Sequence, residues 1–160
     1  MGLGVADETV TGPLHLPAAD EGAESALRAV PGRGPRRGRI LVMDDNRMVC
    51  ETMRRQLVIF GFEVATAGDG QEAVAAYEQA RRDGRPFDLV ILDLLVDGGW
   101  GGERTLAELR GFDPGVKAMV CSGSLSGPPD VYSRQGFGAV LAKPYSLEDL
   151  RRKVETTLSR

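Results

Sequence analysis

Five residues whose types could do chemistry stand at the ends of short apolar runs: Asp44, Asp45, Asp93, Ser122 and Lys143. If these runs are parallel strands of one sheet, the five residues lie at its carboxyl edge, where ligands bind in such sheets. Three neighbouring carboxylates repel one another unless a cation lies among them, and a lysine neutralises only one charge. We therefore expect a Mg²⁺ ion, which binds carboxylates together with phosphate oxygens.

The serine and the lysine extend this expectation to phosphate chemistry. A hydroxyl at Ser122 and an ammonium at Lys143 would face the carboxylates and the metal. Donors of this kind can hold the oxygens of a phosphoryl group carried by Asp93. A single acid at a strand end often does no more than cap a helix. Five such residues at four strand ends are better explained by one site.

The elements that position these residues follow from the apolar pattern. Residues 40–43 and 89–92 are uninterrupted apolar runs, which are typical of central strands buried on both faces. Residues 116–121 and 139–142 predict two further strands. Residues 63–67 alternate more and predict an edge strand.

A helix is predicted after each strand. The first begins at the cap Asn46, carries apolar residues at helical spacing and ends at Gly61. The last begins at Ser146, with Asp149 in the place of the capping-box acid. The others are expected from 69–70 to about 84–86, over 105–110 and over 129–135. Five strand–helix units with short connections predict an α/β fold with a doubly wound, five-stranded parallel sheet.

Composition limits the class of protein. The 160 residues suffice for one domain with a core, and 42% hydrophobic and 27% charged residues are ordinary for a globular protein. A net charge of −3 gives no reason to expect nucleic acid or an anionic membrane as partner. Cys50 and Cys121 lack metal-ligand spacing and are expected to be buried, reduced thiols. We see no signal peptide and no run of about 18 apolar residues, so we expect a cytoplasmic protein.

Four motifs, in this order, resemble the receiver domain of two-component response regulators: ILVMDDN, DLVILDL, VCSGS and GAVLAKPY. The resemblance covers residues 39–158 and implies a receiver domain at 39–160 with the flavodoxin-like strand order 2-1-3-4-5. It implies that Asp93 is the phosphoacceptor, that Ser122 and Lys143 hold the phosphoryl oxygens, and that the Lys143–Pro144 peptide is cis. The protein would phosphorylate itself from a donor and would not otherwise be an enzyme. The resemblance assigns these residues to Mg²⁺: Asp45 directly, Asp44 mostly through water, Asp93, and Leu95 by its main-chain carbonyl.

The chain departs from the usual receiver pattern at three positions. Val96 and Asp97 stand where many receivers have Met-Pro, so Asp97 either adds an acid near the site or caps a turn. Val140 stands where the family usually has an aromatic residue that rotates inward on activation. Valine has no ring to rotate and a stiff χ1. We therefore expect a smaller structural response to phosphorylation at the last strand and helix.

Other classes of protein fit these residues less well. A haloacid-dehalogenase-like phosphatase needs a second aspartate two residues after the nucleophile, and Leu95 cannot transfer a proton. The glycine-rich stretch 98–102 lacks the Lys-Ser/Thr ending of a phosphate-binding P-loop, so we interpret its glycines as flexible turn residues. A receiver-like binding module that is never phosphorylated is a further alternative. Such modules typically lose the acidic pair or the lysine, and this chain keeps both.

Residues 1–38 are rich in Gly and Pro and predict a flexible linker, which ends in the basic run 31–39. Within it, residues 11–19 resemble the last strand of a histidine-kinase ATP-binding domain, and we interpret His15 as a strand or linker residue. We therefore expect the C-terminal receiver of a hybrid histidine kinase, with a free-standing single-domain regulator as the alternative. The expected partners are a histidine kinase and a histidine phosphotransfer protein, with no nucleic acid or membrane contact. We expect a monomer.

Overall fold

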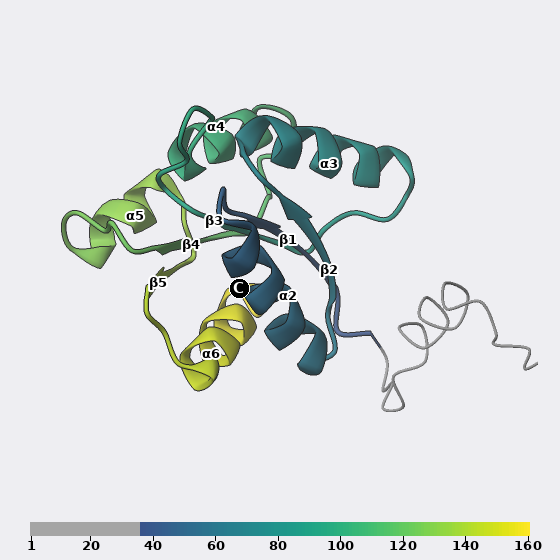
Figure 1. Ribbon diagram of the computed structural model, residues 1–160. Helices are drawn as coiled ribbons and strands as arrows, with labels where there is room; N and C mark the ends of the chain where they lie inside the picture. Colours follow the sequence, from purple (N-terminus) through teal and green to yellow (C-terminus); the bar gives the residue numbers. More distant parts are fainter. Residues whose placement is uncertain (1–35) are drawn as a thin grey trace, which may run out of the picture. The chain divides into compact units, whose positions relative to one another are not determined.

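The computed structural model describes residues 36–160, which alternate strand and helix five times (Figure 1). The elements are β1 (Arg39–Met43), α2 (Arg47–Ile59), β2 (Glu63–Ala67), α3 (Gly70–Arg82), β3 (Leu89–Leu92), α4 (Gly102–Phe112), β4 (Ala118–Ser122), α5 (Pro129–Gln135), β5 (Ala139–Ala142) and α6 (Leu147–Leu158). None of the helices in this range is long and apolar enough to cross a membrane. The kinase-like stretch 11–19, His15 and most of the expected linker lie outside the described residues.

The five strands form one parallel sheet in the order β2-β1-β3-β4-β5, which confirms the expected fold and strand order. Figure 1 shows α3, α4 and α5 on one face of the sheet and α2 and α6 on the other. Strand β3 lies at the centre, and all four of its residues are buried. Its two faces contribute to two separate hydrophobic clusters, one under each helical layer.

Local sequence explains where several helices begin. The side chain of Asn46 accepts hydrogen bonds from two backbone N–H groups of the first turn of α2, and Asp69 accepts one in α3. At α6, the Ser146 hydroxyl accepts a bond from the Asp149 N–H and donates one to the Asp149 carboxylate. The expected cap at Ser146, with Asp149 as its acidic partner, is confirmed.

Several boundaries differ from the sequence-based expectation, most clearly the starts of α4 and β4. Helix α4 begins at Gly102 and not at residue 105, because the backbone already closes the bond from Thr105 N–H to the Gly101 carbonyl. Strand β4 begins at Ala118 and not at residue 116, because Val116 N–H bonds back to Asp113 in a turn. At both starts, glycine or polar residues interrupt the apolar spacing from which the boundary was predicted.

The cysteines behave as expected. Cys50 and Cys121 are buried and form no disulfide. Burial is the main cause that raises the pKa of the Cys50 thiol to about 11 and that of Cys121 to about 12. Both thiols are therefore protonated and packed as small apolar side chains.

The last residues before β1 contact the domain. The Arg36 guanidinium pairs with Glu63 on β2, and Arg37 pairs with Glu155 on α6 at 2.9 Å. Arg37 also donates its backbone N–H to the Gly61 carbonyl. These ion pairs are exposed, and exposed pairs contribute about 0–1 kcal/mol each. The last residues of the basic run, Arg36 and Arg37, therefore lie against the domain, next to the start of β2 and to α6.

Candidate functional site

Three carboxylates meet at the carboxyl edge of the sheet. Asp44 follows β1, Asp45 is the next residue, and Asp93 follows β3. Because β1 and β3 are paired with Met43 beside Leu92, the two strands end at the same level. One oxygen from each carboxylate lies within 4.8 Å of the others. The expected convergence of the three acids is confirmed.

The three carboxylates differ in exposure. Asp44 and Asp93 are buried, at 4% and 9% exposure, whereas Asp45 is exposed. Two backbone N–H groups bond to the cluster, from Asn46 to Asp44 at 2.9 Å and from Asp97 to Asp45 at 3.2 Å. The backbone of the strand ends and turns therefore holds the buried side of the cluster. Its other side, at Asp45, is open to solvent.

Lys143 is the cation nearest to these acids. It follows β5, and its ammonium donates a hydrogen bond to Asp44 and lies 3.5 Å from an Asp93 oxygen. Burial opposes the charged form, but the hydrogen bond to Asp44 and the charges of both acids outweigh it and raise the pKa of Lys143. The Lys143–Pro144 peptide is cis, as the resemblance implied.

Ser122 is the last residue of β4, the strand beside β3, and it is 2% exposed. Because Val120 pairs with Leu92, Ser122 lies one step beyond the level of Asp93. Its hydroxyl oxygen accepts a hydrogen bond from the Ser124 N–H at 3.2 Å. The structure thus places Ser122 at the same rim, on the side of Asp93 away from Asp44.

The residues fit a hard divalent cation. Three carboxylates and one ammonium leave a local excess of negative charge, and all the anionic ligand atoms are oxygens. Mg²⁺ prefers this arrangement, with water completing its coordination on an open side. The exposed Asp45 provides that open side. Asp97 is not one of the three clustered acids; it contributes a backbone donor to Asp45, and its side chain is exposed.

The glycine-rich stretch after β3 has a role that the sequence did not reveal. A Cβ at Gly101 would come within 2.0 Å of the Leu94 carbonyl oxygen, and one at Gly102 within 2.7 Å of the Asp93 carbonyl oxygen. The backbone of this loop therefore folds back against the end of β3. The interpretation of these residues as flexible turn glycines is wrong for Gly101 and Gly102. The one sequence signal for this close packing is the position of the glycines, shortly after the central strand.

Thr105 supports the same packing. Its side chain is fully buried, and its hydroxyl donates to the Gly101 carbonyl at 2.8 Å. The neighbouring Trp100 carbonyl accepts the Gly70 N–H at the start of α3. These hydrogen bonds connect the loop that carries Leu95 to α3 and α4. The Leu95 side chain is 62% exposed, and the role of its main-chain carbonyl as a metal ligand stays a prediction.

Comparisons with known proteins agree with this geometry. A family model described as the response regulator receiver domain matches residues 40–155. A response regulator receiver protein of Anaeromyxobacter sp. (strain Fw109-5) is 36% identical over 110 residues, which are 68% of this chain and 44% of that protein. The transcriptional regulatory protein PrrA of Mycobacterium tuberculosis is 34% identical over 126 residues, 76% of this chain and 50% of PrrA. The chain thus spans half or less of the length of these relatives.

A solved structure shares the fold. The CheY-like response regulator receiver domain protein of Methanospirillum hungatei JF-1 has a TM-score of 0.67 and 27% sequence identity. The similarity covers 76% of this chain and 94% of that one. The five strand–helix units of this chain, residues 39–158, make up about the same share of its length.

The close approach at Gly101 predicts a stability difference between two glycines. Gly101→Ala should lower the free energy of unfolding by about 1–3 kcal/mol, because the added methyl group overlaps backbone. Gly111→Ala in α4 is the control: nothing lies within 4 Å of its Cβ position, so the change should stabilise by about 0.5–1 kcal/mol. Urea unfolding measures both. Equal effects of the two substitutions would contradict the tight packing of the loop.

The carboxylate cluster predicts that Mg²⁺ stabilises the protein. A ligand that binds only the folded state adds about 2.7 kcal/mol when present at a hundred times its Kd. Thermal unfolding should therefore shift upward in millimolar Mg²⁺. Asp45→Asn should reduce this shift, whereas Asp130→Asn, the same change at a distant exposed ion pair on α5, should not. A melting temperature of the unchanged protein that does not respond to Mg²⁺ would refute the metal site.

Proposed function

The chain belongs to the response regulator receiver family, and on this premise we propose that Asp93 accepts a phosphoryl group from a phosphohistidine of a histidine kinase or a histidine phosphotransfer protein. Members of this family act as phosphoacceptors and are not enzymes that turn over a separate substrate. The observation that carries the proposal is the position of Asp93 at the end of the central strand, beside two further carboxylates and one ammonium.

The chemistry at Asp93 is a phosphoryl transfer between two nucleophiles. A carboxylate oxygen of Asp93 attacks the phosphorus, the bond from phosphorus to the donor imidazole nitrogen breaks, and the imidazole leaves with that electron pair. An acyl phosphate forms on Asp93. The transferred group has charge on its oxygens, so the site must supply positive charge and hydrogen-bond donors rather than a proton-transferring base.

Lys143 and Ser122 would supply the donors. The ammonium of Lys143 already lies between Asp44 and Asp93, so it can turn to a phosphoryl oxygen on Asp93 with a small movement. The Ser122 hydroxyl accepts a bond from a backbone N–H and keeps its own proton free to donate. Each of these contacts stabilises the phosphorylated form.

Asp44, Asp45 and Asp93, with the main-chain carbonyl of Leu95, are the residues that would hold Mg²⁺. When bound, the ion supplies positive charge that offsets the repulsion between the carboxylates and the phosphoryl oxygens. The clustered carboxylates and their oxygen-only chemistry support this assignment, and the exposure of Asp45 leaves room for water and phosphate.

The kinase-like stretch 11–19 supports an origin as the C-terminal receiver of a hybrid histidine kinase. A reading frame for a histidine-kinase core directly upstream of this sequence would support that origin. An unrelated upstream sequence would instead support a free-standing regulator. The retained acidic pair and lysine argue against a receiver-like module that is never phosphorylated.

The proposed function predicts selective labelling of one aspartate. With acetyl phosphate and Mg²⁺, the protein should gain one base-labile phosphoryl group, and Asp93→Ala should abolish the gain. Asp97→Ala is the control, because Asp97 lies near the site but outside the carboxylate cluster. Intact-mass spectrometry measures the gain. Equal labelling of the Asp93→Ala protein would refute the assignment, and no labelling of the unchanged protein would favour the non-phosphorylated module.

A further inference from the structure

One backbone donor in the site comes from a residue that is not among the clustered acids. The Asp97 N–H donates a hydrogen bond to Asp45 Oδ2 at 3.2 Å, and the two residues are 52 positions apart in the chain. Asp44, by comparison, is buried and accepts bonds from the Asn46 N–H and from Lys143. Asp45 is exposed, and within residues 36–160 the Asp97 N–H is the one hydrogen bond to its carboxylate.

A tight turn sets the direction of this N–H. Residues 96–99 form a β-turn, which is closed by a hydrogen bond from the Gly99 N–H to the Val96 carbonyl at 3.4 Å. Gly98 has a φ of +70° and Asp97 a negative φ, the pattern of a type II turn with Asp97 at its second position. The N–H at that position is not used inside the turn, so it is free to bond outward to Asp45.

Both ends of the turn are packed. The Val96 side chain contacts the hydrophobic cluster under α3 and α4. A Cβ at Gly99 would come within 2.8 Å of the Asp69 side chain and within 3.1 Å of Val96. Both ends of the turn therefore lie against other parts of the domain, and this packing fixes the Asp97 N–H relative to Asp45.

We propose that the main-chain N–H of Asp97 is a positioning group for Mg²⁺: it holds the Asp45 carboxylate in the orientation that binds the ion and thereby raises the affinity of the site. A carboxylate has about four lone-pair sites, so one bond to an N–H leaves others for a cation. Hydrogen bonds to a ligating carboxylate orient it and contribute to metal affinity. The proposal rests on the assignment of Asp45 to Mg²⁺ under the proposed function, and it does not depend on phosphorylation of Asp93.

The contact depends on the residue type at position 97. Many receivers have proline at this position, and proline has no N–H to donate. The Asp97 side chain is exposed and lies outside the carboxylate cluster, so the contribution to the site comes from the backbone. The departure from Met-Pro at residues 96 and 97 thus adds a hydrogen-bond donor to the site and not a further acid.

Two substitutions at this position separate the N–H from the side chain. Asp97→Pro removes the N–H and keeps the turn, because proline is common at the second position of a type II turn. Asp97→Ala removes the same carboxylate but keeps the N–H. In a calorimetric titration without a phosphoryl donor, Mg²⁺ should bind about tenfold more weakly to Asp97→Pro than to Asp97→Ala. Asp97→Ala should bind within about threefold of the unchanged protein at about 0.15 M salt, where exposed charges are screened.

The two affinities decide between positioning and competition. Equal affinities of the proline and alanine variants would overturn the proposal. Tighter binding to Asp97→Pro would also overturn it, since the N–H would then compete with the ion for Asp45. A lack of Mg²⁺ binding by the unchanged protein would refute the metal site and this proposal together. A lack of phosphorylation at Asp93 would leave both affinities measurable, so the two failures are distinguishable.

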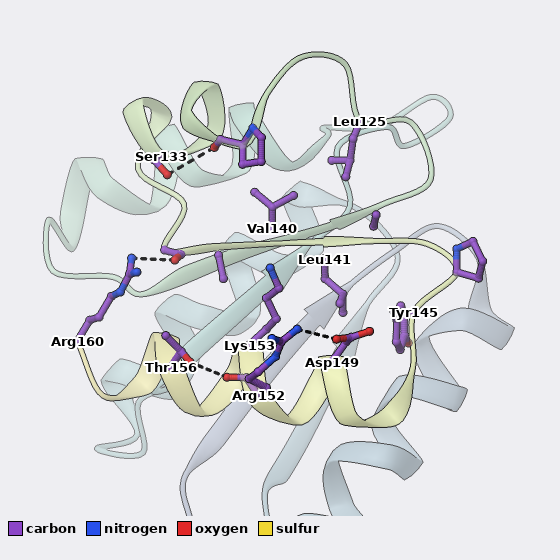
Figure 2. A pocket seen from close by; sticks show the side chains of 15 residues that line it. Leu125, Ser133, Val140, Leu141, Tyr145, Asp149, Arg152, Lys153, Thr156 and Arg160 are labelled. Atoms are coloured by element: carbon purple, nitrogen blue, oxygen red, sulfur yellow. Dashed lines mark hydrogen bonds and ion pairs between the residues drawn. The ribbon is translucent and has the colours of Figure 1, made fainter.

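A second measurement does not depend on how the proline variant folds. In the unchanged protein without Mg²⁺, the bond to a carboxylate should move the Asp97 amide proton downfield, and Asp45→Asn should move it back, because a neutral oxygen is a weaker acceptor. The Gly99 amide, whose bond lies inside the turn, should change much less. Asp149→Asn is the control, because that carboxylate lies on α6, where it pairs with Arg152 and lines the groove along β5 (Figure 2). An Asp97 amide proton that Asp45→Asn leaves unmoved, or that Asp149→Asn moves equally, would overturn the proposal.

Discussion

The mutual repulsion of three carboxylates is the constraint on which the rest of this structure depends. Asp44 and Asp93 are buried beside each other with Asp45 at the rim, and one ammonium cannot neutralise them all. Unpaired buried charge is costly, so the surrounding structure must hold the acids together against that cost. The pairing of β1 with β3 does so, because both strands are buried on each face and end at one level.

The loop after β3 also helps to hold the three carboxylates together. The loop after β3 folds back onto the strand at Gly101 and Gly102, where no side chain would fit. Thr105 and the start of α3 fasten that loop, and the Asp97 N–H donates to Asp45. The packing and hydrogen bonds of this backbone hold the acids in place before a cation or a phosphoryl group binds, so less reorganisation is needed when either does.

Much of this was predictable from sequence, and the remainder depended on contacts across space. Four apolar runs and one alternating segment located the five strands, and the polar residues that follow these segments located the acids, the serine and the lysine, because both signals are local. The strand order followed from the resemblance and not from periodicity. The bond from Lys143 to Asp44 joins residues far apart in the chain, and the close approach of Gly101 to Leu94 needs coordinates. Neither contact produces a periodic pattern of apolar residues in the sequence. The sequence therefore does not distinguish glycines required by close packing from glycines of a flexible turn.

Strand β5 also contributes to the acidic site, through the residue that follows it. Lys143 comes directly after Ala142, and its N–H donates a hydrogen bond to the Ser122 carbonyl at 3.0 Å. The ammonium of the same residue bonds to Asp44 and lies 3.5 Å from an Asp93 oxygen. The pairing of β5 with β4 therefore fixes where the positive charge lies relative to the carboxylates, just as the pairing of β1 with β3 fixes the carboxylates themselves.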